Sequence, residues 1–165
     1  MTDNARSLGE LIAELEAQEL QLMFPGFDND DAWTLGRSFV EVAKARGLPV
    51  TIDIRRHGQQ LFHAALPGTS PENDSWIDRK VRVVNRFNAS SYLVGRRFEA
   101  EGDTLDEAFG VKPIEYAAHG GSFPIRVAGV GVIGTVTVSG LAQGDDHALV
   151  VEVIDAFLTG HPLSS

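Results

Sequence analysis

The chain has 165 residues, of which 43% are hydrophobic and 22% charged, with no cysteine and a formal net charge of −9. This length predicts one domain over residues 1–165 that buries most of its unfolded surface without a metal or a disulfide. The lack of cysteine excludes disulfides, thiolate metal sites and a catalytic thiol, and the acidic charge argues against a nucleic-acid-binding surface. No run approaches the roughly 20 apolar residues of a membrane helix and no secretory signal is recognisable, so we expect a cytoplasmic protein that does not bind membranes.

Two amphipathic helices are predicted first. Ser7 with Glu10 three residues later has the capping-box pattern, and apolar residues then recur on one face, which predicts a helix over about residues 7–20. We expect this helix to act as a packing or oligomerisation arm. An acidic run at 28–31 can cap a second helix, which Gly47 then ends.

A β-hairpin comes next. Its predicted strands cover residues 50–55 and 60–66, and its turn lies at His57–Gly58. In the first strand, β-branched apolar residues alternate with polar ones. The polar residues are Thr51, Asp53 and Arg55. This pattern predicts a sheet with one covered face.

The period then becomes helical, from about Asn73 to Asn88, and a second helical segment is expected over 92–101. Lys80 lies in an apolar row of the first of these helices, beside Trp76. A lysine in such a row either extends its ammonium group to solvent or is held for a partner in a pocket, with a lowered pKa.

The last third of the chain predicts a second hairpin and a final helix. After one more short helical turn at 103–109, a glycine-rich segment supplies strands at 122–128 and 132–139, joined by a turn at 129–131. A strongly periodic helix covers about 145–158. Two hairpins separated by helices predict an α+β fold, an antiparallel sheet with helices packed on it.

The corner after His119 is the main candidate site. Gly120 and Gly121 let successive backbone N–H groups converge on an anion, while the imidazole can donate, accept or bind a metal. We therefore predict a ligand pocket lined by His119, Gly120, Gly121 and Ser122, with Lys80 as a further candidate. The alternative is a plain turn into a strand, with a surface histidine.

Other kinds of site have weaker sequence support. The chain has no metal-binding spacing such as H-E-x-x-H and no G-x-S-x-G nucleophile pattern. Without cysteine, any haem would be non-covalent, with His, Tyr or Met on the iron and Lys or Arg at the propionates. His147, at the start of the last helix, is predicted to be a buried structural histidine.

Several sequence blocks resemble one known family. The blocks include Trp76-Ile-Asp-Arg-Lys80, His119-Gly-Gly-Ser-Phe-Pro-Ile125, Ala65-Leu-Pro-Gly-Thr69 and Gly131-Val-Ile-Gly134. They are similar to the uncharacterised "haem-degrading domain" family related to the HbpS and GlcG proteins, over about residues 30–155. The resemblance implies a profilin-like or PAS-like fold with a five-stranded antiparallel sheet, a homo-oligomer, and haem binding.

Three functions stay open at this point. The first is a cytosolic, oligomeric small-molecule-binding protein of the HbpS/GlcG-like type, with an anionic molecule or haem as ligand. The second is an enzyme that uses His119 as acid/base and the glycine N–H groups to stabilise an oxyanion. The third is a non-catalytic assembly or adaptor protein.

Overall fold

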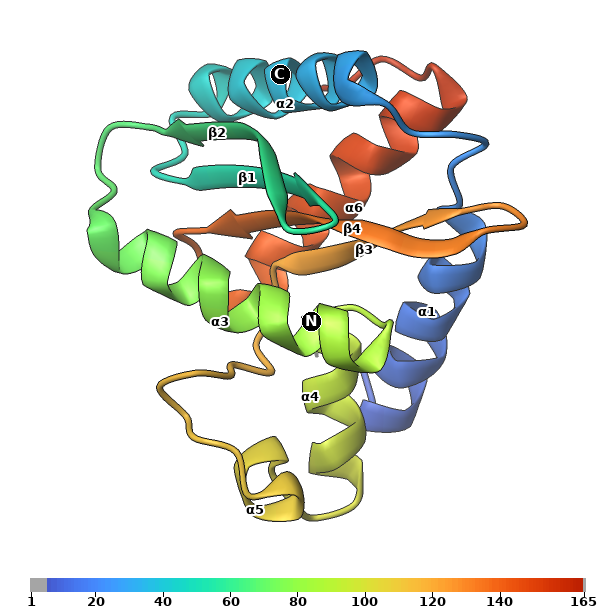
Figure 1. Cartoon of the computed structure of the whole chain (residues 1–165), viewed down its shortest axis with the longest axis vertical. Helices are drawn as coiled ribbons and strands as arrows, with labels where there is room; N and C mark the ends of the chain where they lie inside the picture. Colours follow the sequence, from blue (N-terminus) through green and yellow to red (C-terminus); the bar gives the residue numbers. More distant parts are fainter. Residues whose placement is uncertain (1–5, 165) are drawn as a thin grey trace, which may run out of the picture.

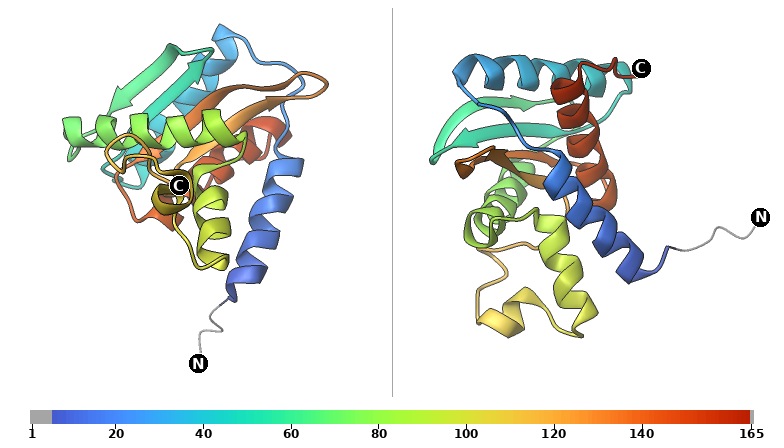
Figure 2. Two further views of the ribbon diagram at one scale, coloured as in Figure 1. Left: turned by 60° about the horizontal axis from the view of Figure 1, so that its bottom comes forward. Right: turned by 90° about the vertical axis from the view of Figure 1, so that its right-hand side faces the viewer.

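The computed structural model describes residues 6–164, which form an antiparallel sheet with helices on both faces (Figures 1 and 2). The four strands lie in the order β2–β1–β4–β3. They are β1 (Thr51–Arg56), β2 (Gln59–Ala65), β3 (Ser122–Val127) and β4 (Gly131–Ser139). The helices are α1 (Leu8–Gln21), α2 (Asn29–Ala45), α3 (Pro71–Phe87), α4 (Ser91–Ala100), α5 (Leu105–Phe109) and α6 (Gln143–Thr159). The predicted α+β class is confirmed.

The helices begin where side chains cap them. Ser7 and Glu10 form the predicted capping box of α1. The cap of α3 is Ser70, whose hydroxyl accepts the Glu72 amide, and Pro71 is the first helical residue. The predicted start of α3 near residue 73 was therefore too far along the chain. Proline is well suited to the first position of a helix, and Pro71 is already helical.

Both predicted hairpins are present. In the first, His57 and Gly58 have φ values of +50° and +80°, the left-handed pair that a two-residue turn between twisted strands requires. In the second, the turn lies at 128–130 between β3 and β4. The two hairpins join through β1 and β4, which pair antiparallel from Thr51–Ser139 to Arg56–Gly134.

The sheet has four strands among the described residues, so the expected five-stranded sheet was wrong. Beyond β3, the only pairing among residues 6–164 is a single parallel bridge between Phe24 and Val127. The Phe24 amide donates to Arg126 O at 2.8 Å, and Phe24 O accepts the Ala128 amide at 2.9 Å. The pairing is limited to this one residue, so Phe24 does not form a fifth strand.

One face of the sheet carries the main apolar core. The alternate residues that point to this face are covered by α2 and α6. Fully buried members from the sheet are Ile52, Ile54, Phe123, Ile125, Val136 and Val138, and from the helices Leu35, Phe39, Val150, Val153 and Ile154. Val50, just before β1, is also fully buried.

The opposite face of the sheet is polar and is also buried. Thr51, Asp53 and Thr137 are fully buried, because α3 crosses this face (Figure 1). The expectation of one covered face was therefore wrong. Asp53 is held by Gln60, whose Nε2 donates to its Oδ1 at 2.6 Å, and by Arg55, whose Nε lies 2.8 Å from its Oδ2. A buried polar layer thus separates the sheet from α3.

The N-terminal helix α1 packs beside α4 at one end of the molecule (Figure 2). Leu15 enters a small second core there. Near the C-terminal end of α1, the buried Glu19 accepts the Ser90 amide at 2.6 Å and pairs with Arg126 at 3.0 Å. These contacts fix α1 to α4 and β3 within one chain, while a role in oligomerisation stays a prediction.

Candidate functional site

Lys80 lies between α3 and the polar face of the sheet and is 3% exposed. Its Nζ donates to Val138 O and to Asp146 Oδ2, both at 3.1 Å. Of the two alternatives for this lysine, extension to solvent is wrong, because the ammonium group is held by a buried carboxylate. Asp146 is in turn oriented by the Leu141 amide, which donates to Oδ1 at 2.9 Å.

Burial acts on both members of this pair. It lowers the pKa of Lys80 and raises the pKa of Asp146, in each case because the charged form loses its hydration. The attraction between the two charges opposes both shifts. Such a pair is costly to break from one side, since the remaining charge is left buried without a partner.

The two glycines of the predicted pocket are explained by close packing. A Cβ on Gly121 would lie 2.4 Å from Val138 O and 2.7 Å from Lys80 Nζ, and the residue has φ +131°. A Cβ on Gly120 would lie 2.1 Å from Gln143 O, at the start of α6. Glycine therefore lets the chain pass between the Lys80 ammonium and α6.

The backbone N–H groups of this corner are largely used by the fold. The Gly120 amide donates to Gln143 Oε1 at 3.2 Å, and the Ser122 amide donates to Ser91 Oγ at 3.1 Å. The Ser122 hydroxyl lies 2.9 Å from Thr137 Oγ1. The predicted anion-binding nest of Gly120 and Gly121 loses the Gly120 amide, which is already bonded. Gly120, Gly121 and Ser122 line neither of the two cavities described below.

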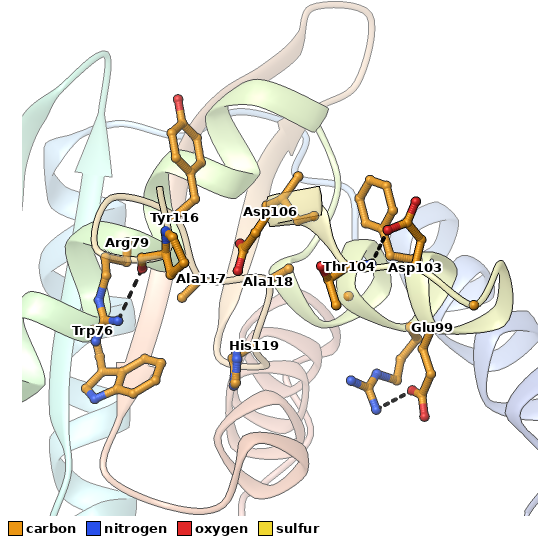
Figure 3. A pocket seen from close by; sticks show the side chains of 16 residues that line it. Trp76, Arg79, Glu99, Asp103, Thr104, Asp106, Tyr116, Ala117, Ala118 and His119 are labelled. Carbon is orange, nitrogen blue, oxygen red and sulfur yellow. Dashed lines mark hydrogen bonds and ion pairs between the residues drawn. The ribbon is translucent and has the colours of Figure 1, made fainter. Parts of the chain in front are cut away.

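His119 is exposed, and its ring lies against Trp76 of α3, with 5.3 Å between the ring centroids (Figure 3). These two rings stand between two cavities and line both of them. His119 and Lys80 both line the smaller of these cavities, although they are far apart in the sequence.

The larger cavity has a volume of about 590 Å³ and lies between α3, α4, α5 and the segment 113–119 (Figure 3). Arg79 stacks on the Trp76 ring at 3.9 Å and donates to Pro113 O at 3.5 Å. Arg96 pairs with Glu99 at 2.6 Å. Apolar side chains complete the wall, and Asp103 and Asp106 add carboxylates at the α5 end. The apolar members are Phe98, Leu105, Pro113, Tyr116, Ala117 and Ala118.

The pKa of His119 is lowered, first by burial of part of its ring and then by the positive charges of Lys80, Arg96 and Arg79. Asp106 opposes this shift. The imidazole is therefore neutral at pH 7, which is the form that binds a metal or accepts a proton.

The smaller cavity has a volume of about 340 Å³ and lies on the other side of the two rings. Lys80 and Asp146 line its inner end. Polar side chains surround the rest, together with the backbone at the end of β4. They are Asn73, Ser139 and Gln143.

Sequence reasoning missed several members of the site. Asp146, Arg96 and Asn73 were not predicted to line a pocket. The one usable signal for Asp146 was Lys80 itself, since a lysine in an apolar helix row needs a carboxylate partner. His147 is buried as predicted, with Nε2 2.7 Å from Gln18 Oε1.

Metal ligands do not gather in the described residues: no group of three or more His, Asp or Glu side chains is placed to hold an ion. Among these same residues, no helix is long and apolar enough to cross a membrane.

The family model described as haem degrading protein HbpS-like matches residues 27–155. The chain belongs to this family. The resemblance noted in the sequence is thereby confirmed, and the match includes every residue of the two cavities. A UPF0303 protein of Streptomyces avermitilis is 61% identical over 154 residues, which is 93% of this chain and 94% of that protein.

Solved structures share the HbpS-like fold. Ybr137w superposes with a TM-score of 0.82 at 34% identity, covering 90% of this chain and 88% of its own. PduOC, solved as a complex with haem, superposes with a TM-score of 0.67 at 19% identity, covering 79% and 94%. The second likeness shows the fold alone.

Proposed function

We propose that this HbpS-like protein binds a planar, anionic small molecule in the 590 Å³ cavity, with haem as the best-fitting class. The observation that carries the proposal is the pairing of the neutral imidazole of His119 with two arginines, Arg79 and Arg96, around an aromatic-lined cavity. A volume of this size lies within the range of small-molecule sites, which are mostly apolar with a few polar groups that fix orientation.

The residues present fit a haem. Histidine is a common axial ligand of haem iron, and a neutral imidazole is the form required. Arg79 and Arg96 line the same cavity and can pair with two propionates. Trp76, Phe98 and Tyr116 line the cavity with aromatic side chains, which can contact a macrocycle. When bound, haem would supply an iron centre for ligand binding or redox chemistry, and the chain would supply its orientation.

Family evidence supports the same class of ligand. The family description names haem degradation, and PduOC is a haem complex. Oligomerisation and a cytoplasmic location stay predictions, and so does a catalytic use of His119.

Titration of the purified protein with haemin tests the proposal. We expect a Soret shift that saturates at one haem per chain in the wild type and is lost in His119→Ala. The matched control is His161→Ala, because His161 is exposed beyond the far end of α6. A shift that does not saturate, or that His119→Ala leaves unchanged, would refute binding through His119.

A further inference from the structure

The chain uses lysine sparingly. It has three lysines and eleven arginines. Lys44 and Lys112 are exposed, whereas Lys80 is 3% exposed. Arginine is the usual residue for a buried ion pair, and lysine differs from it by having an amine that can lose its proton and act as a nucleophile. The buried position is thus occupied by lysine, whose amine can become a nucleophile.

The surroundings of Lys80 leave its amine beside open space. It lies at the inner end of the 340 Å³ cavity, and Gly121 has no side chain to cover it. Asp146 Oδ2 lies 3.1 Å from Nζ, and the other carboxylate oxygen is held by the Leu141 amide. A carboxylate fixed in this way can take a proton from the amine and return it.

The charges around Lys80 come from three elements. Arg79 on α3 lowers the pKa of the amine, Asp146 on α6 raises it, and burial, the largest cause, lowers it. His119, in the loop before β3, is neutral at pH 7 because its own pKa is lowered. Burial favours proton transfer from Lys80 to Asp146, and the attraction between the two charges opposes it. The 3.1 Å contact between Nζ and Oδ2 is the path by which Asp146 can take one proton from the ammonium group.

We propose that the 340 Å³ cavity is a carbonyl site, in which Lys80 forms an imine with a small hydroxy-aldehyde or hydroxy-ketone. The amine nitrogen attacks the carbonyl carbon to form a carbinolamine, Asp146 returns its proton to the carbinolamine oxygen, and water leaves as the C=N bond forms. The ammonium group supplies both hydrogens of the departing water by way of Asp146. The protonated imine therefore keeps one hydrogen on nitrogen, beside the Asp146 carboxylate, and no oxidant or reductant is needed.

The cavity favours a ligand of this size and polarity. A volume of about 340 Å³ is near the lower end for small-molecule sites, so a tetrapyrrole is excluded from it. Asn73, Ser139 and Gln143 can donate to and accept from hydroxyl groups of the ligand. The site thus goes beyond the proposed haem-binding function and uses the opposite side of the Trp76–His119 pair.

Reductive trapping at pH 7 tests the proposal on the wild-type protein. Glycolaldehyde is the probe, sodium cyanoborohydride reduces any imine to a stable secondary amine, and peptide mass spectrometry measures the label on each lysine. Because a lowered pKa leaves more free amine at pH 7, we expect more label on Lys80 than on Lys44 or Lys112, although both of these are exposed. Label on Lys80 at or below that of the exposed lysines would overturn the proposal.

Two variants sharpen the result. Lys44→Arg with Lys112→Arg leaves Lys80 as the sole lysine side chain, and this variant should retain the Lys80 label in full. Adding Lys80→Met should remove it. Haemin titration of the wild-type protein separates the two sites. Haem binding without a Lys80 label would overturn only the carbonyl site, and a Lys80 label without haem binding would overturn only the haem site.

Discussion

The two faces of the sheet are both buried, but they are built from different chemistry. The face toward α2 and α6 is apolar, with side chains such as Phe123 and Ile52 that have no polar atoms to satisfy. The face toward α3 holds Thr51, Asp53 and Thr137, and Lys80 of α3 packs on it. Its end at Ser139 lines the smaller cavity. An apolar face stabilises the fold without further conditions, whereas a polar face stabilises it only when every charge has a partner. The comparison assigns stability to one face and the candidate site to the other.

The largest effect is expected on the apolar face. Phe123→Ala removes a fully buried aromatic ring, and we expect a loss of about 4 kcal/mol in the free energy of unfolding, measured in urea. The variant should still bind haemin at temperatures where it is folded, because Phe123 lines neither cavity. A loss below about 1 kcal/mol would contradict the assignment of this face to stability.

The next largest effect is expected when one partner of the buried Lys80–Asp146 pair is removed. Lys80→Met leaves Asp146 buried without its partner, and we expect a loss of about 3 kcal/mol, again from urea unfolding. In the double variant Lys80→Met/Asp146→Asn the charge is gone, so more than half of this loss should be recovered. If the double variant is as unstable as the single one, packing of the lysine chain matters more than its charge.

A smaller effect depends on pH and concerns His147, whose ring centroid lies 6.1 Å from that of Phe123. Burial lowers the pKa of His147 to about 4 from 6.5, so below pH 6.5 the unfolded chain takes up a proton that the folded chain does not. The neutral His147 makes its full contribution to the free energy of unfolding above pH 6.5. This contribution is lost as the pH falls towards 4. We expect a loss of about 2 kcal/mol between pH 8 and pH 5.

His147→Gln provides the control for this pH dependence. Its unfolding free energy should vary less than that of the wild type between pH 8 and pH 5. An unchanged pH dependence would show that another group, and not His147, takes up the proton.

The sequence predicts the apolar face of the sheet better than the polar face. Period-2 alternation in 50–55 and 132–139 was sufficient to predict which residues form the apolar face. Alternate side chains of a strand point to the same side of the sheet, so the apolar ones share one face. The burial of the polar face was missed, since Thr51 and Asp53 read locally as solvent-exposed residues. Their burial depends on where α3 crosses the sheet, which is a tertiary fact that no local pattern contains.

The candidate site was also predicted in part. His119 and Lys80 both line the smaller cavity, and their binding of a ligand stays a prediction. Gly120 and Gly121 were interpreted as ligand-binding amides, but they line neither cavity. Glycine at a close approach and glycine in an anion nest have the same sequence signature, and only the position of Lys80 Nζ and Gln143 separates them. Asp146 and Arg96 come from distant segments, so their roles required the fold.

A crystal structure of the protein with haemin tests the central claim most directly. The account predicts a haem in the 590 Å³ cavity, its iron bound by the His119 imidazole and its propionates paired with Arg79 and Arg96. A haem bound elsewhere on the chain, or held without His119, would contradict it.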